Sequence, residues 1–312
     1  MSRQFVFVEA TDADTEAVRD LVNRHELSVD PQAATMSDDG IAELMAGYVD
    51  ESQSWLMRDG AGALVGFVQL HPDANRSLYF PDVYCDPQLA ALAEATAAAV
   101  DFVLSLSEEQ HPDWSLRSGL NSKDDLLRGA YLARGFEYLR KFWSLSRPVV
   151  ADDVWPELPA GIAVRRAEDH REDMRILHAL HQDSFSNHFG FKPREFENWM
   201  ALELEKQTRD PAGNFILFEN EQPAAFLLSA TEMAHENGGY VDLIGVKHAS
   251  QGKGFGKLLL QCAAAHARDK GFTKIDLNVD TGNESAALRV YEAAGFRPFS
   301  AWEQYELVRA SL

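Results

Sequence analysis

The sequence predicts an α/β protein in which one fold occurs twice, each copy a mixed, twisted sheet flanked by helices. The chain has 312 residues, more than the commonest size of a single compact core. The helix ending Tyr-x-x-x-Gly-Phe occurs at residues 131–136 and again at residues 291–296. The strand and helix patterns that precede this ending follow the same order in both halves, which indicates an internal repeat.

Hydrophobic periodicity predicts, in each copy, a strand and a helix, then a three-strand run, then a helix, a strand and a final helix. In the first copy these elements cover residues 5–25, 55–58, 63–70, 78–84, 89–106 and 114–119, followed by the helix with Tyr131. In the second copy they cover residues 163–180, 214–223, 224–229, 240–246, 256–270 and 273–280, followed by the helix with Tyr291.

The stretch between the copies contains three prolines within residues 146–161, which is typical of a stiff linker. We therefore expect one domain at residues 1–148, a linker at 149–161 and a second domain at 162–312.

Composition limits the class of protein. A formal net charge of −20 argues against binding nucleic acid or an anionic membrane, and it mildly favours cationic partners such as amines. The chain has only two cysteines, Cys85 and Cys262, and no HExxH spacing, so we expect no disulfide and no metal. The absence of a signal segment and of a long apolar stretch predicts a cytoplasmic protein. We expect a monomer or a homodimer.

The second copy contains a glycine-rich loop between a strand and a helix. Glycines let the backbone approach a ligand closely, and successive amides can converge on an anion at the positive end of the helix. No acid occurs between residues 243 and 268, whereas basic side chains surround the glycines. The loop and its basic neighbours are Lys247, His248, Gln251, Gly252, Lys253, Gly254, Phe255, Gly256 and Lys257.

The spacing decides between phosphate-binding loops. Only three residues separate Gly252 from Gly256-Lys257, and Leu258 follows, so the loop is not a Walker loop. The dinucleotide fingerprint GxGxxG is also absent. The loop instead resembles the Gln/Arg-x-x-Gly-x-Gly/Ala signature of the GCN5-related N-acetyltransferases (GNAT), whose loop amides hold the pyrophosphate of coenzyme A. Residues 283–296 look like the family's Asn-x-x-Ala…Tyr-x-x-x-Gly-Phe helix, with one additional residue between Asn283 and Tyr291.

The resemblance implies two tandem GNAT folds and an acetyl-CoA-dependent transfer to a small-molecule primary amine, with acetyl-CoA as co-substrate. It assigns the thioester carbonyl to backbone N–H groups of Leu243, Ile244, Gly245 and Val246, further cofactor contacts to Asn283 and Ala286, and the proton for the leaving thiolate to Tyr291. For the base, strand spacing places Tyr240 and Asp242 on one face and Leu243 on the other, and Glu232 and Glu236 are further candidates. A module that binds acyl-CoA without turnover is the alternative.

The first copy lacks this machinery. Its corresponding stretch, residues 83–92, has no glycine and contains Asp86, and no Lys or Arg occurs between Arg76 and Arg117. We expect a degenerate first domain that does not bind coenzyme A, with Tyr131 as a core aromatic. Residues 185–199 are rich in aromatic side chains, which either line an acceptor pocket or pack two short helices together.

Overall fold

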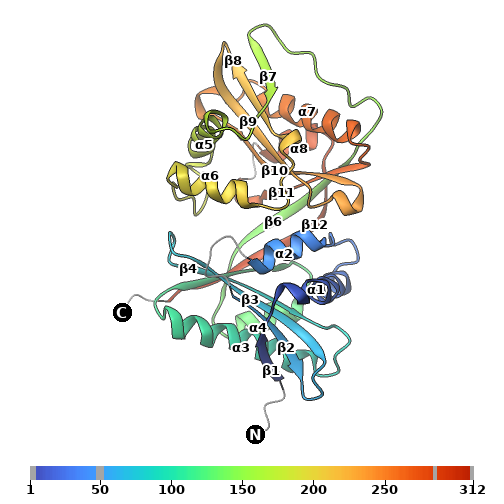
Figure 1. Cartoon of the computed structure of the whole chain (residues 1–312), viewed down its shortest axis with the longest axis vertical. Helices are drawn as coiled ribbons and strands as arrows, with labels where there is room; N and C mark the ends of the chain where they lie inside the picture. The colour runs from blue at the N-terminus through green and yellow to red at the C-terminus, as the bar shows by residue number, and fades with distance from the viewer. Residues whose placement is uncertain (1–4, 47–52, 284–286, 310–312) are drawn as a thin grey trace. The chain divides into compact units, whose positions relative to one another are not determined.

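The computed structural model describes residues 5–46, 53–283 and 287–309 (Figure 1). The chain forms two compact units, one made of residues up to 142 together with those from 300 onward, the other of residues 143–299. Within the described residues, no helix combines the length and the apolar character that a membrane span requires. Both cysteines are free and buried.

The first unit contains a mixed sheet with two helices on each face. Its strands, in spatial order, are β1 (Phe5–Glu9), β2 (Gln53–Asp59), β3 (Leu64–Asp73), β4 (Leu78–Cys85), β5 (Ser115–Asn121) and β12 (Arg297–Leu307). Helices α1 (Thr15–Val29) and α2 (Asp38–Ala46) bury Val18, Leu21 and Ile41 against one face. On the other face, α3 (Leu92–Gln110) and α4 (Asp125–Leu132) bury Val100, Val103 and Tyr131.

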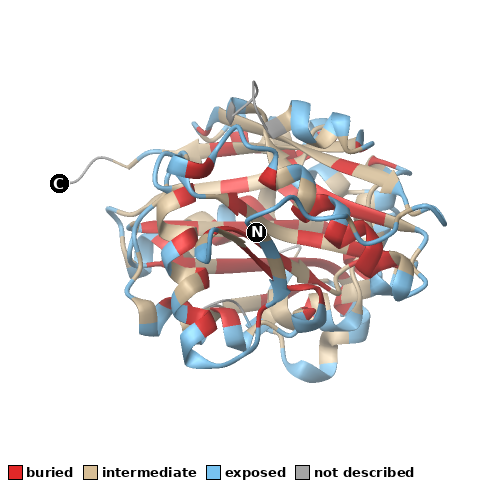
Figure 2. Ribbon diagram, turned by 90° about the horizontal axis from the view of Figure 1, so that it is seen from above, coloured by how far each residue is buried: buried red, intermediate tan, exposed pale blue. Residues whose placement is uncertain are grey.

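The second unit repeats the plan. Its strands, in spatial order, are β6 (Glu137–Pro148), β11 (Lys274–Asp280), β10 (Gly238–Val246), β9 (Gln222–Ala230), β8 (Phe215–Glu219) and β7 (Ile162–Arg166). Helices α7 (Phe255–Asp269) and α8 (Ala287–Ala293) cover one face of this sheet. Helices α5 (Arg171–Phe185) and α6 (Phe196–Glu205) cover the other. The buried residues gather on the strands and on the helix surfaces turned toward them (Figure 2).

The mixed α/β fold predicted from the sequence is confirmed, and the predicted strands and helices agree with the observed ones to within a few residues. The terminal strands β6 and β12 were not predicted. Their apolar residues do not alternate strictly, and most of their side chains are only partly buried. The compact units also differ from the boundaries expected at 148 and 162, because β12 pairs with β5 from Trp302↔Asn121 to Leu307↔Leu116. Residues 300–312 thus group with the first unit.

Candidate active site

The glycine loop of the second unit leads from β10 into the first turn of α7. Gly252 and Gly254 have φ values of 76° and 85°, in the left-handed region that favours glycine. A Cβ atom at either position would meet no protein atom within 4 Å, so the space above the loop is open. Helix α7 begins at Phe255, and its first amides have no acceptor within the helix. The loop therefore presents unpaired amides to an open surface, which suits an anion.

The charges around the loop are less uniform than the sequence suggests. Lys247 and Lys257 are exposed and have no acidic partner in the described part of the chain. Lys253, however, lies 2.8 Å from both carboxylate oxygens of Glu219 on β8. Its ammonium group holds the pKa of Glu219 below its usual range. Lys247 and Lys257 are thus available to bind an anion, whereas Lys253 already forms an ion pair with Glu219, which is distant in sequence.

An opening between β10 and β11 leads toward this loop. The two strands pair in parallel from Gly238↔Lys274 to Val241↔Leu277 and no further, although β10 continues to Val246 and β11 to Asp280. Strand β10 remains paired with β9 as far as Val246. The edge of β10 that faces β11 is therefore not paired with β11 at residues 242–246, a stretch that includes residues 243–246, the positions predicted to contact the cofactor.

A β-bulge lies at the start of this opening. Val241 pairs with Ser229 and Leu243 pairs with Leu228, which leaves Asp242 as the additional residue. Leu243 packs with the buried cluster under α5 and α6, on the face where Asp242 also lies. The prediction that Leu243 points to the opposite face from Asp242 is therefore wrong, because the bulge reverses the alternation of side chains after it.

Gly245 is a glycine for a packing reason. A Cβ atom there would lie 2.4 Å from Ser184 Oγ on α5 and 2.5 Å from the Phe226 ring on β9. The side chains of Ile244 and Val246 pack on the other face, against the core under α7. Gln251 donates from Nε2 to the Val246 carbonyl at 3.3 Å, so its side chain braces the loop.

Asp242, a candidate base, is held in an ion pair. Lys206, directly after α6, places its Nζ 2.9 Å from Asp242 Oδ2 and 3.1 Å from Glu203 Oε2. Burial lowers the pKa of Lys206, but the attraction of Asp242 and Glu203 outweighs it and leaves that pKa raised. The Asp242 carboxylate is thus held by Lys206 on the α6 side of the sheet, so the geometry disfavours Asp242 as the base.

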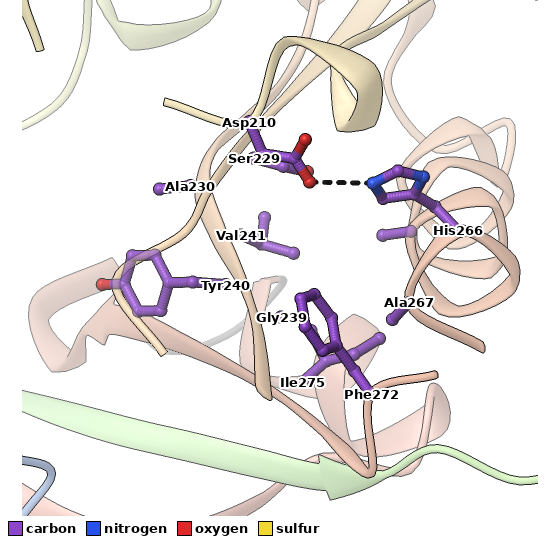
Figure 3. Close-up of a pocket in the computed structure, with 11 residues that line it drawn as sticks. Asp210, Ser229, Ala230, Gly239, Tyr240, Val241, His266, Ala267, Phe272 and Ile275 are labelled. Carbon is purple, nitrogen blue, oxygen red and sulfur yellow. Dashed lines mark hydrogen bonds and ion pairs between the residues drawn. The ribbon is translucent and has the colours of Figure 1, made fainter. Parts of the chain in front are cut away.

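Tyr240, the other candidate, points away from α7. Figure 3 shows a small pocket on the α7 side of the sheet, where Asp210 accepts a hydrogen bond from His266 Nε2 at 2.8 Å, and the Tyr240 ring is directed away from it. Tyr240 thus lies on the face covered by α5 and α6. The pocket in Figure 3 includes no residue of the glycine loop.

Helix α8 brings Tyr291 to the region of the loop. A Cβ atom at Gly256 would lie 3.8 Å from Val290 and 3.9 Å from Val246, so α8, α7 and the end of β10 meet there. Tyr291 is half-buried, and burial raises the pKa of its phenol to about 12. Its hydroxyl has no hydrogen-bond partner among the described residues. Asn283 ends the short helix Thr281–Asn283, and Ala286 lies outside the described residues.

The equivalent tyrosine of the first unit is in a different environment. Tyr131 is fully buried, and its hydroxyl lies 2.7 Å from Ser118 Oγ on β5. Ser118 in turn donates to the Pro81 carbonyl on β4 at 2.8 Å. Strands β4 and β5 pair only at Leu78↔Ser115 and Tyr79↔Leu116, so this chain of bonds spans the gap between them. The prediction that Tyr131 is a core aromatic is confirmed.

The aromatic segment at residues 185–199 mainly packs. Trp199 is 5% exposed, and Phe185 and Phe196 contact the same cluster, which favours the packing alternative for these three residues. His181 on α5 stacks on Phe185, and burial lowers the pKa of His181 to about 4, so its imidazole is neutral at pH 7. Sequence reasoning did not single out His181, because one histidine on a helix carries little signal.

Residues 174–296 match the model of the acetyltransferase (GNAT) family. The chain is also similar in fold to a GCN5-related N-acetyltransferase from Sphaerobacter thermophilus, with a TM-score of 0.79 and 17% identity over 100% of this chain and 98% of that one. A tandem GNAT protein from the clavulanic acid biosynthesis pathway gives a TM-score of 0.76 at 15% identity, over 97% of this chain and 98% of that one. Residues 174–296 thus match the GNAT family, and the whole chain has the fold of tandem GNAT proteins.

More particularly, the chain is similar to mycothiol acetyltransferases. It is 31% identical to that of Thermobispora bispora over 55% of this chain and 59% of the relative. It is 26% identical to that of Rhodococcus erythropolis over 76% of this chain and 78% of the relative. The match spans 59% of the length of the Thermobispora bispora protein and 59% of that of the Salinispora tropica protein.

Proposed function

We propose that the second unit is an acetyl-CoA-dependent N-acetyltransferase that moves an acetyl group to a primary amine of a small molecule. The observation that carries this proposal is the opening between β10 and β11, which exposes unpaired backbone groups and ends at a basic glycine loop. The similarity to mycothiol acetyltransferases supports the reaction class and makes mycothiol acetylation a specific alternative to test.

The described residues fit acetyl-CoA in two places. The amides of residues 252–257, with Lys247 and Lys257, would hold the pyrophosphate in the open space above the loop. The free edge of β10 at residues 243–246 would hold the pantetheine arm and donate an N–H to the thioester carbonyl. The family resemblance assigns further cofactor contacts to Asn283 and to Ala286, the latter outside the described residues.

Tyr291 would donate a proton to the sulfur as the thiolate leaves. Its phenol is neutral at pH 7 and has no competing acceptor among the described residues, so its proton is available. Tyr131 has the equivalent position in the first unit, but its hydroxyl is hydrogen-bonded to Ser118. This difference supports a single acetyl-CoA site for each chain, in the second unit.

Calorimetric titration of the full chain with acetyl-CoA, followed by thiol release over a panel of primary amines, tests the proposal. We expect one acetyl-CoA for each chain and turnover with at least one amine. Gly254→Val should raise the Kd at least about tenfold, since a β-branched residue cannot easily adopt a φ of 85° and would occupy the phosphate's space. Two equivalent sites would contradict the proposal, and tight binding without turnover of any amine would indicate a sensor instead.

A further inference from the structure

A second carboxylate lies beside Tyr240, on a strand that sequence reasoning did not connect with the base. Asp276 is in β11, and its Cα is the register partner of Tyr240 on β10. Its neighbours Ile275 and Leu277 belong to the core under α7. Since side chains alternate along a strand, Asp276 faces the opposite side, which Tyr240 and Asp242 also face.

The surroundings of Asp276 compensate its charge only in part. The residue is 2% exposed, and neither carboxylate oxygen has a hydrogen-bond partner. Lys274 Nζ lies 3.1 Å from Oδ2, outside hydrogen-bonding geometry, and the same ammonium is 2.7 Å from Glu236 Oε2. Burying a carboxylate without hydrogen-bond donors is unfavourable, and such groups are concentrated at functional sites.

Asp276 also lies close to the place where the thioester would be held. It is one residue before Leu277, the last residue of β11 that pairs with β10. Adjacent strands are about 4.8 Å apart, and two residues along a strand span about 6.6 Å, so Asp276 and Asp242 are roughly 8 Å apart across the start of the opening.

The other titratable groups on this face together favour a cation. Glu203 and Asp242 share Lys206, while Glu236 and Asp276 share Lys274, so four carboxylates face two ammonium groups. His181 is neutral at pH 7 and adds no charge. The face thus carries an excess of negative charge, and Asp276 is its least satisfied member.

We infer that Asp276 receives the ammonium group of the acceptor and takes its proton, so that the cationic primary amine is recognised and activated by the same carboxylate. This inference rests on the proposed function. One proton passes from nitrogen to Asp276 and on to solvent. The neutral amine then forms the C–N bond as the C–S bond breaks. Tyr291 donates its phenolic proton to the leaving sulfur, and a second proton passes from the nitrogen to Tyr291 and restores its phenol.

The register position of Asp276 carries a cation in the first unit. Ser115 is the first residue of β5 that pairs with β4, and Lys274 is the first residue of β11 that pairs with β10. Counting two residues on from each, Arg117 corresponds to Asp276. Arg117 is bound to Glu306 at 2.7 Å. A guanidinium at this position would repel an ammonium group, so the carboxylate is a feature of the unit with the open site.

The test compares Asp276→Asn with wild type, using the full chain and the amine with the highest turnover in a panel of amino-acid amides, amino sugars and diamines. We expect kcat/KM to fall by about 10² to 10³, with KM raised and acetyl-CoA affinity unchanged. The pH profile should move toward the pKa of the free amine. Asp276→Glu should recover part of the rate, and the Tm of Asp276→Asn should change little, because Lys274 keeps its ion pair with Glu236.

Asp173→Asn is the matched structural control. Asp173 is also fully buried but is satisfied by Arg165 and by the Glu168 amide, so its loss should lower Tm and leave the pH profile unchanged. Turnover by Asp276→Asn with an unchanged rate and pH profile would overturn this inference alone. A full chain that binds acetyl-CoA but acetylates no amine would overturn the proposed function and this inference with it.

Discussion

Replacing Tyr291 with phenylalanine separates a role in catalysis from a role in packing. The ring stays, and only the hydroxyl is lost. Because that hydroxyl has no hydrogen-bond partner in the described part of the chain, the free energy of unfolding should change by no more than about 0.5 kcal/mol. If the hydroxyl donates to the leaving sulfur, kcat should fall by about 10², which corresponds to about 2.7 kcal/mol in the barrier.

The pKa values make this proton transfer reasonable. Burial raises the pKa of Tyr291 to about 12, and it also raises the pKa of the Cys262 thiol, in the same core, to about 11. A thiolate that leaves in such surroundings is more basic than one in water, so the acid and its acceptor remain matched. Since the raised pKa keeps the phenol neutral, its donation should persist to about pH 10, the ordinary tyrosine value, and be lost as the pH rises toward 12.

Tyr131→Phe is the control for this experiment. It removes the same atom from the same motif, but here the hydroxyl is bonded to Ser118 in a buried site. We expect a loss of about 1–3 kcal/mol in the free energy of unfolding and no change in kcat. Single-turnover rates and chemical denaturation of both variants measure the two effects. An unchanged single-turnover rate for Tyr291→Phe would assign Tyr291 to packing.

Three further predictions concern stability. Gly245→Ala should lower stability by about 1–3 kcal/mol in denaturant unfolding, because its Cβ would lie 2.4 Å from Ser184 Oγ; an unaltered midpoint would contradict this packing. Burial raises the pKa of Asp210, but His266 and Lys270 outweigh it and leave that pKa lowered. The ionised Asp210 therefore stabilises the fold at pH values above the ordinary carboxyl pKa, and this stabilisation is lost as the pH falls through the lowered pKa. Asp210→Asn should therefore lower Tm at pH 7, and the difference should shrink in acid. A truncated protein of residues 143–299 should melt cooperatively, and acetyl-CoA should raise its Tm. A truncated protein of residues 160–312 should aggregate, because it lacks residues 143–148 of the second unit and leaves β12 without its partner β5. Cooperative melting of the 160–312 protein would refute this prediction.

The repeat, the order of elements and the glycine loop could be predicted because they depend on local signals. Alternation along strands, glycines at residues 252 and 254 and the Tyr-x-x-x-Gly-Phe ending each occupy a short stretch of chain. The partners of the terminal strands could not be predicted, because the pairing of β12 with β5 joins residues that are far apart in sequence. A domain given as one continuous stretch of sequence cannot describe a unit that also contains residues 300–312 from the end of the chain.

The candidate base shows the same limit. The bulge at Asp242 depends on how β9 pairs with β10, and it moved Leu243 to the face opposite to the one expected from simple alternation. Lys206 comes from a different element and neutralises Asp242. The sequence does not distinguish Asp276 from other acidic residues on strands. Only the structure does so, because both of its carboxylate oxygens are buried and have no hydrogen-bond donor. Candidate bases therefore depend on long-range contacts, whereas an anion-binding loop depends on local backbone conformation.

The two copies together suggest why only one of them keeps a site. Both contain parallel central strands that part after a few pairs, so the opening belongs to the fold. In the first unit, Pro81 contributes no amide to the gap, and Ser118 and Tyr131 fill it with their own hydrogen bonds. At the position of Ser118 the second unit has Leu277, whose backbone pairs with Val241 but whose side chain has no hydroxyl to bond the edge of β10 beyond it. Unpaired backbone groups are costly unless a ligand satisfies them, so loss of the ligand would favour the internal bonds seen in the first copy. On this argument Leu277→Ser should weaken acetyl-CoA binding even though residue 277 lies outside the glycine loop, and unchanged affinity in a calorimetric titration would refute it.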